Sequence, residues 1–220
     1  MSRMFSALAY CGVYLCSGYM LNNLHDREED PESKNRFKVM PERTSRRVTL
    51  GLHAALALVA AINDLVPESL SIVALNLAYS ARPVRLKRFL PASLFCNGLF
   101  FAFPYYVSAK IVADRVDSGA FQFAGYVFLI FLPLQYLHHL EHVEDSGTRA
   151  GLGLRLGSIA FLALPCIYTA LPALEPLHRF HAGTVAFSVA ALIAVLALRS
   201  AASARVAVRV LGLVLGVFLI

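Results

Sequence analysis

Long apolar runs separated by short polar segments make up most of this 220-residue chain. The runs are continuous stretches of Ala, Leu, Val and Phe without the period-two alternation of barrel strands, which favours helices. We therefore predict eight hydrophobic helices, at about residues 4–21, 48–63, 69–81, 90–112, 119–139, 154–172, 181–198 and 206–220. Because a helix needs about 20 apolar residues to cross a bilayer, the third and the last segments are the weakest membrane spans.

The composition indicates a membrane protein. Hydrophobic residues make up 58% of the chain and charged residues 15%, with a mean hydropathy of +0.62, whereas a soluble domain carries more charge. Only helices or closed barrels satisfy all backbone polar groups in lipid. We predict an all-α fold, a polytopic transmembrane helical bundle that forms a single domain over residues 1–220.

The basic residues are distributed unevenly between the loops. If successive loops alternate across the membrane, one side holds residues 21–47, 82–89, 140–153 and 199–205 with the adjoining helix ends. Only four of the 20 Lys and Arg residues then fall on the other side, namely Arg3, Lys110, Arg115 and Arg179. By the positive-inside rule the basic side is cytoplasmic and both termini are external. We expect an integral protein of a bacterial inner (plasma) membrane with its site on the cytoplasmic side, and no nucleic-acid partner.

A cluster of amide and carboxylate side chains follows the first apolar run. Asn22, Asp26 and Asp30 are four residues apart, so they share one face if the helix continues. Such oxygen donors are the ligands that Mg²⁺ prefers. Lys34 and Arg36 follow one to two turns later and could hold the outer oxygens of a diphosphate. The alternative is an ordinary charged cytoplasmic loop.

A second polar motif, at the end of the third apolar run, completes a family resemblance. The sequences Asn22-Asn23-x-x-Asp26-x-x-x-Asp30, Asn35-Arg36 and Tyr79-Ser80-x-x-Pro83-x-Arg85-Leu86-Lys87-Arg88 resemble the motifs of the UbiA-type intramembrane prenyltransferases. For the basic residues alone, anchoring to anionic headgroups is an alternative. The resemblance covers about residues 5–200 and begins at the family's second helix, so we expect a first helix to be missing.

This family has a second acidic motif, which corresponds here to the segment from His138 to Gly151. Glu141 and Asp145 are four residues apart in it, on one face of a helix. His138-x-x-Glu141-His142 also matches the H-x-x-E-H pattern of one class of zinc peptidases, so a peptidase or an oxygenase is an alternative. Polar residues at a membrane interface are a further alternative for these histidines.

The resemblance implies Mg²⁺-dependent transfer of an isoprenyl group from an allylic isoprenyl diphosphate to an aromatic or quinone-precursor or other acceptor. The metal ligands that it implies are Asn22, Asp26, Asp30, Glu141 and Asp145. The diphosphate ligands that it implies are Asn22, Lys34, Arg36, Arg85 and Lys87. The implied catalytic residues are Asp26, Asp30, Lys87 and Tyr79, the last as an aromatic face for the allylic cation.

The chain departs from the family pattern in two of these motifs. Asn23 replaces an aspartate, and histidines and glutamates replace much of the second aspartate motif. The alternative function is therefore a non-catalytic lipid-binding or scaffold membrane protein that has kept the fold.

Overall fold

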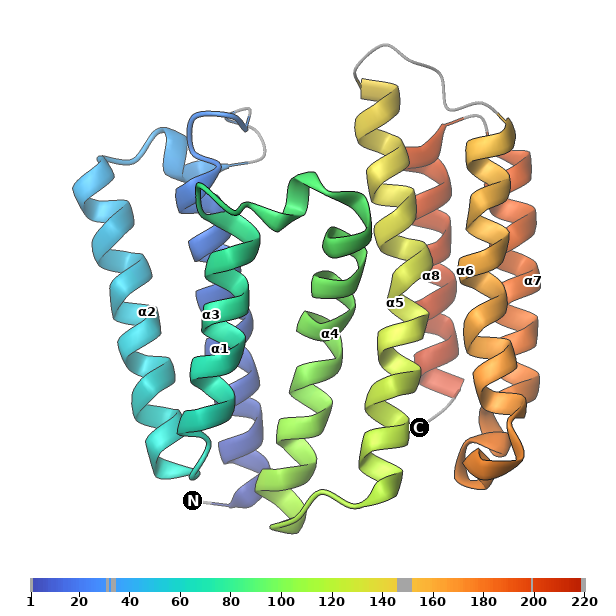
Figure 1. The fold of residues 1–220 in the computed structure, drawn as a ribbon, viewed down its shortest axis with the longest axis horizontal. Coiled ribbons are helices and arrows are strands. Elements are labelled where there is room, and N and C mark those ends of the chain that lie inside the picture. The colour runs from blue at the N-terminus through green and yellow to red at the C-terminus, as the bar shows by residue number, and fades with distance from the viewer. Residues whose placement is uncertain (1, 31, 33–34, 146–151, 199, 219–220) are drawn as a thin grey trace. The chain divides into compact units, whose positions relative to one another are not determined.

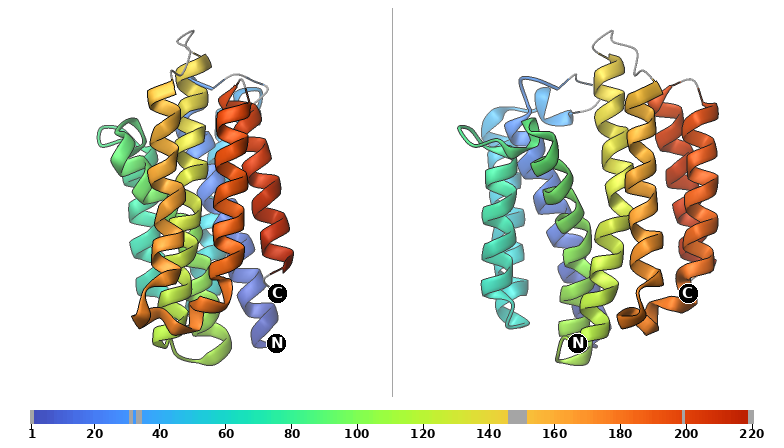
Figure 2. Two further views of the ribbon diagram at one scale, coloured as in Figure 1. Left: turned by 90° about the vertical axis from the view of Figure 1, so that its right-hand side faces the viewer. Right: turned by 45° about the vertical axis from the view of Figure 1, so that its right-hand side comes forward.

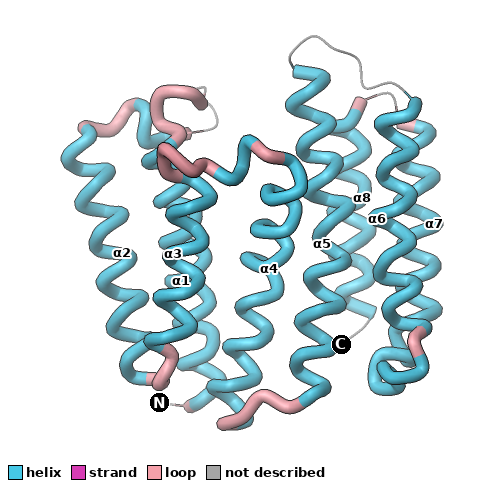
Figure 3. Tube along the Cα trace, in the orientation of Figure 1, coloured by secondary structure: helices cyan, strands magenta, loops and turns pink. Residues whose placement is uncertain are grey.

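A computed structural model describes residues 2–30, 32, 35–145, 152–198 and 200–218. Its α-helices are α1 (Arg3–His25), α2 (Glu42–Ile62), α3 (Val66–Ser80), α4 (Leu90–Ala113), α5 (Ser118–Asp145), α6 (Leu152–Ala170), α7 (His181–Ala197) and α8 (Ala201–Phe218). Its short 3₁₀ helices are η1 (Arg36–Lys38), η2 (Leu86–Arg88) and η3 (Pro172–Phe180). The described residues contain no strand (Figure 1; Figure 3). The predicted all-α fold with eight helices is confirmed.

Several helix ends differ from the prediction, including the end of α5 at Asp145 and the two ends next to the first acidic motif. α1 continues beyond Leu21 to His25, and α2 begins at Glu42, well before residue 48. The apolar runs mark only the lipid-compatible part of each helix, and charged residues such as Arg43, Arg46 and Arg47 extend α2 beyond it. The polar connection is consequently shorter than expected, which brings the first acidic motif close to both helices.

Among the described residues, the segments long and apolar enough to cross a membrane are five: Arg3–His25, Glu42–Ile62, Leu90–Ala113, Ser118–Glu141 and Leu177–Ala197. α3 has 15 residues, which is short for the hydrocarbon core of a bilayer. Large apolar side chains such as Leu8, Leu58 and Ile193 are exposed on the helix surfaces, as expected for side chains that face lipid. These features agree with a polytopic membrane protein.

The chain forms two compact units, Met1–Cys96 with Pro104–Val116, and Asn97–Phe103 with Asp117–Ile220. In the first unit, α1 packs against α2 and α3. The buried face of α1 includes Tyr10, Tyr14, Ser17 and Leu21, which recur every three or four residues as a packed helical face requires. Because α1, α2 and α3 alternate in direction, the end of α1, the start of α2 and the end of α3 lie at the same end of this unit (Figure 1).

In the second unit, α5 packs against α6 and α8, and α7 packs against α6 and α8 (Figure 2). Tyr126 of α5 packs with Leu174, Leu177 and Phe180 of η3 in a buried cluster. The Tyr126 hydroxyl lies 2.7 Å from Thr184 Oγ1, so this buried phenol is hydrogen-bonded. The prediction of a single domain over the whole chain stays a prediction.

Candidate functional site

The end of α1 presents the first acidic motif. The helix ends at His25, with Asp26 as its C-cap. The Asp26 amide donates to the Asn22 carbonyl (2.9 Å), and the Asp30 amide donates to the Asp26 carbonyl (2.9 Å). The four-residue hydrogen-bond spacing therefore continues past the regular helix, so Asn22, Asp26 and Asp30 follow one another at one-turn intervals.

The turn after α3 brings the basic motif to this helix end. Arg85 has left-handed backbone angles, φ 45° and ψ 59°, and η2 begins directly after it. A non-glycine residue in this region costs about 1–2 kcal/mol, which the contacts of the Arg85 side chain must offset. That side chain is only 5% exposed, because the turn directs it toward α1 and away from solvent.

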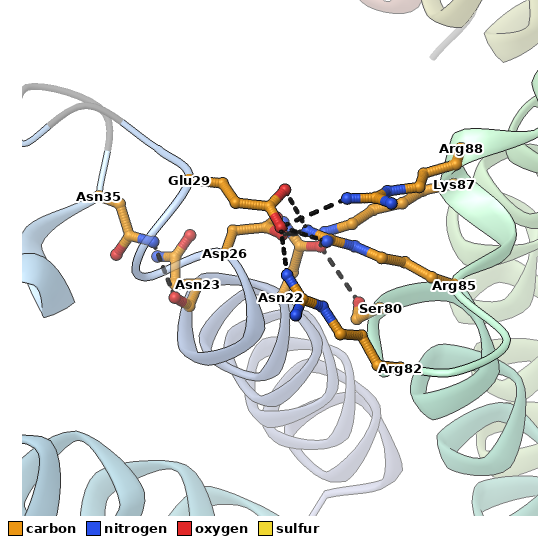
Figure 4. Close-up of polar contacts among 10 residues, drawn as sticks. All are labelled: Asn22, Asn23, Asp26, Glu29, Asn35, Ser80, Arg82, Arg85, Lys87 and Arg88. Carbon is orange, nitrogen blue, oxygen red and sulfur yellow. Dashed lines mark hydrogen bonds and ion pairs between the residues drawn. The ribbon is translucent and has the colours of Figure 1, made fainter.

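Arg85 and Lys87 bind the acidic motif directly, as Figure 4 shows. Arg85 Nη2 lies 2.8 Å from Asp26 Oδ1, and Lys87 forms an ion pair with the same oxygen. Lys87 Nζ also donates to Asn22 Oδ1 (3.0 Å), and so does the Ser80 hydroxyl (3.1 Å). The structure thus brings together four of the predicted site residues, two from each motif.

Glu29 is a member of this cluster that the sequence analysis did not assign. Its carboxylate binds Arg85, with Arg85 Nη2 2.6 Å from Oε2, and it pairs with Arg82 (3.1 Å) and Arg88 (3.5 Å). Glu29 follows Asp26 by three residues, and this spacing was the available signal that both side chains lie on one face. We call Asn22, Asp26, Glu29, Arg85 and Lys87 the helix-end cluster.

The close packing of opposite charges shifts the pKa values of this cluster. Hydrogen bonds from Arg85 and Arg82 lower the pKa of Glu29 to about 2. Hydrogen bonding to Glu29 raises the pKa of Arg85, although burial opposes the shift. Burial lowers the pKa of Lys87, and its hydrogen bond to Asp26 opposes that shift. The carboxylate of Glu29 and the guanidinium of Arg85 are therefore both held in their charged forms at neutral pH.

The oxygen donors of the cluster are of the kind that Mg²⁺ prefers. Both ion pairs to Asp26 reach Oδ1, and in the described part of the chain neither Asp26 Oδ2 nor the Asp30 carboxylate has a hydrogen-bond partner. No group of three or more His, Cys, Asp or Glu residues close enough to hold a metal occurs among the described residues. The oxygens of Asn22 and Asp26 fit Mg²⁺ by their chemistry, since Mg²⁺ usually takes one or two protein ligands and completes its shell with phosphate oxygens and waters. Asp30 contacts Asp26 through its backbone amide, and Mg²⁺ binding by these three side chains stays a prediction.

The buried Nε of Arg85 is a further polar group that fits a ligand. It has no hydrogen-bond partner among the residues described. A buried donor without a partner costs about 1–3 kcal/mol, so a ligand oxygen that accepts from it would recover this energy. Guanidinium groups bind phosphate oxygens well, which makes Arg85 a candidate phosphate ligand.

The other predicted residues of this region lie outside the cluster. Arg36 is exposed at the start of η1, and Lys34 lies outside the described residues. Tyr79 is half-buried in α3. The neighbouring Asn35 is fully buried: its Nδ2 donates to the Asn23 carbonyl (2.7 Å), and its Oδ1 accepts from the Phe37 amide (3.0 Å). Asn35 therefore ties the segment after the acidic motif to the end of α1, a role that the sequence analysis missed.

The second acidic motif lies at the end of α5, in the second unit. Glu141 is half-buried, and its Oε2 lies 2.5 Å from Arg205 Nη2 of α8 and 3.4 Å from His138 Nδ1. Glu144 Oε2 accepts a hydrogen bond from the Ala201 amide at the start of α8 (2.7 Å). These contacts join α5 to α8. The side chains of Asp145 and His142 lie outside the described ones, so metal binding by Glu141 and Asp145 stays a prediction.

These observations define a polytopic helical membrane protein in which acidic and basic motifs from separate helix ends meet at the helix-end cluster. The chain matches the family model of the UbiA prenyltransferase family over residues 2–198, and it belongs to that family. Neither a curated protein nor a solved structure matches the chain. The predicted family is confirmed, and the chain is a prenyltransferase-type membrane protein.

Proposed function

We propose that this chain is an intramembrane prenyltransferase of isoprenoid biosynthesis. It would transfer an isoprenyl group from an allylic isoprenyl diphosphate to an aromatic, quinone-precursor or other small acceptor, with Mg²⁺ as cofactor. The observation that carries the proposal is the contact of Asn22 and Asp26 with Arg85 and Lys87. The residues that we propose as metal ligands thus contact those that we propose as phosphate ligands, as binding of a metal-bound diphosphate would require.

The charges of the helix-end cluster support this chemistry. Ionisation of an allylic diphosphate places negative charge on the leaving group, so cations fixed nearby stabilise the transition state more than the ground state. Arg85 is held in place by two carboxylates, and Lys87 by Asp26 and Asn22. Such preorganised donors need little rearrangement when charge develops.

We assign the following roles to the residues. Asn22, Asp26 and Asp30 would hold Mg²⁺, which when bound supplies Lewis-acid stabilisation of the leaving diphosphate. Arg85 and Lys87 would bind phosphate oxygens, and Arg36 and Lys34 would be further phosphate ligands. Tyr79 would provide an aromatic face to the allylic cation. Glu29 would position Arg85 without contacting the substrate.

The test is release of diphosphate from farnesyl or geranylgeranyl diphosphate by the full chain in lipid vesicles. Release should depend on Mg²⁺, and Asp26→Asn or Asp30→Asn should lower its rate roughly 10²–10³-fold, as expected for loss of a group that stabilises developing charge. Asp64→Asn is the matched control, because Asp64 is exposed and its left-handed φ of 54° is one that asparagine tolerates. Rates unchanged in both site variants would end the catalytic proposal.

One set of contacts favours a non-catalytic lipid-binding or scaffold protein as the second candidate. Asp26 is already neutralised by Arg85 and Lys87, and Glu141 is paired with Arg205. On this reading the acidic residues hold helices together and bind no metal. Absence of diphosphate release with every donor and acceptor, from a chain that is folded in the same vesicles, would select this candidate.

A further inference from the structure

A cavity of about 980 Å³ lies beside the end of α1 within the first unit. Its walls come from the end of α1, the segment at η1, the first half of α2 and the second half of α3. The lining includes apolar residues, among them Leu21, Leu50 and Leu77, which we call the floor, and three cations, Arg27, Lys38 and Arg46, which we call the rim, together with the carboxylates of Glu28 and Glu42. A volume of this size is at the upper end of the range of roughly 300–1,000 Å³ for ligand pockets.

This cavity is distinct from the helix-end cluster. From α1 and the turn after it the cavity is lined by Leu21, Leu24, His25, Arg27 and Glu28, and no member of the helix-end cluster is among its lining residues. At about 100° per residue, Leu21 and Leu24 lie roughly 100° and 160° around the helix from Asn22. A molecule in the cavity would therefore contact another face of α1 than the one that meets Arg85.

The rim carries more positive than negative charge. Arg27 and Arg46 share one carboxylate, that of Glu42, at 3.8 Å and 2.5 Å. Arg27 also donates to the Met40 carbonyl (2.7 Å), and Lys38 Nζ donates to the Asp30 carbonyl (2.9 Å). The lining also includes Glu28, so three cations stand against two carboxylates, and the one excess positive charge favours an anionic group.

The apolar floor and the position of the rim at the helix ends favour a lipid over a small inorganic anion. Leu50 is 70% exposed and Leu77 is 42% exposed, so the floor offers apolar surface that a free inorganic ion would not cover. α1 and α2 are both apolar enough to span a bilayer, and the rim lies at their charged ends, where lipid headgroups are found. Basic residues at that level attract anionic headgroups, and long basic side chains extend toward them.

We propose that this cavity binds one anionic phospholipid of the surrounding leaflet. Its phosphate would be held by Lys38 and Arg46 at the rim, with Arg27 behind them, and its acyl chain would lie on Leu21, Leu50 and Leu77. Binding there would fasten the end of α1 to the start of α2. The proposal does not rest on catalysis, because it concerns a different face of α1.

The experiment titrates the full chain, in neutral detergent, with phosphatidylglycerol or phosphatidylcholine of the same acyl chains and counts bound lipid by native mass spectrometry. The first phosphatidylglycerol should bind roughly tenfold tighter than phosphatidylcholine, given the contribution of each basic residue near an anionic headgroup. Lys38→Gln with Arg46→Gln should remove this preference. Arg43→Gln with Arg47→Gln is the matched control, since both residues are exposed on α2 and do not line the cavity.

A second variant separates a lipid from a simple anion. Leu50→Gln should weaken binding of long-chain phosphatidylglycerol several-fold, and it should leave binding of a short dihexanoyl form unchanged because that form barely reaches the floor. Inorganic phosphate in 100-fold excess should not displace the long-chain lipid. Displacement by phosphate, equal binding of the two lipids, or equal losses in the two double variants would overturn the proposal. All readouts are lipid binding, so they are independent of diphosphate release.

Discussion

The guanidinium of Arg85 lies between two carboxylates, and one of its nitrogens is 2.8 Å from Asp26 Oδ1 and 2.6 Å from Glu29 Oε2. A planar group with several donors can serve both acids at once, which a lysine ammonium at the end of a flexible chain does less well. The left-handed backbone at this position is tolerated because the buried ion pairs compensate for it. At the scale of single residues, Arg85 is therefore the link between the acidic and the basic motif.

Replacing Arg85 tests this link. In Arg85→Met, Glu29 still pairs with the exposed Arg82 and Arg88, and Asp26 still pairs with Lys87. We therefore expect a loss of about 1–3 kcal/mol in the free energy of unfolding, which is less than for a fully unpaired buried charge. Arg85→Lys should lose less. The control Arg82→Met removes a residue whose side chain is 74% exposed and should stay within about 0.5 kcal/mol of the wild type. Denaturant unfolding in detergent measures all three, and equal losses for Arg85→Met and Arg82→Met would contradict the assignment.

The lowered pKa of Glu29 leads us to expect that the protein loses stability in acid. Its folded-state pKa lies at about 2, below the ordinary value of 4.5, because of hydrogen bonds from Arg85 and Arg82. A lowered folded-state pKa means that the stabilisation is complete above pH 4.5 and is lost as the pH falls toward 2. Melting temperatures recorded between pH 6 and pH 2.5 should fall more steeply for the wild type than for Glu29→Gln. Parallel curves would show that Glu29 contributes nothing to the folded state.

At the scale of helices, the close approach of α1 and α3 decides whether the two motifs meet. Gly18 of α1 faces Asn76 of α3, and a Cβ at this glycine would lie 2.8 Å from Asn76 Nδ2. Asn76 is buried, so it cannot turn away into solvent. The helices therefore pack closely just below the helix-end cluster, and the register of Asn22 against Ser80 depends on that packing.

Gly18→Ala should push α1 away from α3. We expect a loss of about 1–3 kcal/mol in stability, as for other overpacked sites, together with weaker binding of a diphosphate ligand because Asp26 moves relative to Lys87. Gly12→Ala is a control on the same helix: a Cβ there meets nothing within 4 Å, and alanine favours the helix by up to about 1 kcal/mol. Melting temperatures of the two variants, recorded with and without the diphosphate ligand, compare both effects. A stabilised Gly18→Ala chain would mean that α1 and α3 are not in close contact.

The existence of the helices followed from the sequence, but their ends and the contacts of the site did not. The continuous apolar runs predicted the eight helices. They did not predict that Glu42 to Arg47 is helical, which is possible because charged residues do not by themselves end a helix. The spacing of Asn22, Asp26 and Asp30 predicted their common face. The pairing of Asp26 with Arg85 depends on a left-handed turn after α3, and the pairing of Glu141 with Arg205 joins residues 64 positions apart. Spacing along one helix carries no information about either contact.

At the scale of the whole chain, each of the two units holds a carboxylate at the end of its first complete helix, and each carboxylate is bound by a basic residue from a later helix or turn. In the first unit Asp26 meets Arg85 and Lys87, and in the second Glu141 meets Arg205. Among the described side chains the two cases differ in composition, because the first adds amide and carboxylate oxygens of the kind that Mg²⁺ prefers while the second adds a histidine. This difference favours the first unit for the metal and phosphate chemistry that we propose.

Variants of Glu141 and Arg205 test whether the second acidic motif is structural or binds metal. The two roles predict different results in a double-mutant cycle. If the pair joins α5 to α8, Glu141→Gln and Arg205→Gln should each lower the free energy of unfolding by about 1–3 kcal/mol, since each removes a half-buried ion pair between the two helices. The double variant should then lose clearly less than the two losses combined. The concentration of Mg²⁺ needed for half-maximal diphosphate release should stay the same in all three variants. If Glu141 is instead a metal ligand, Glu141→Gln should raise that concentration about tenfold or more while Arg205→Gln does not, and the second acidic motif would then belong to the catalytic centre as the family resemblance implies.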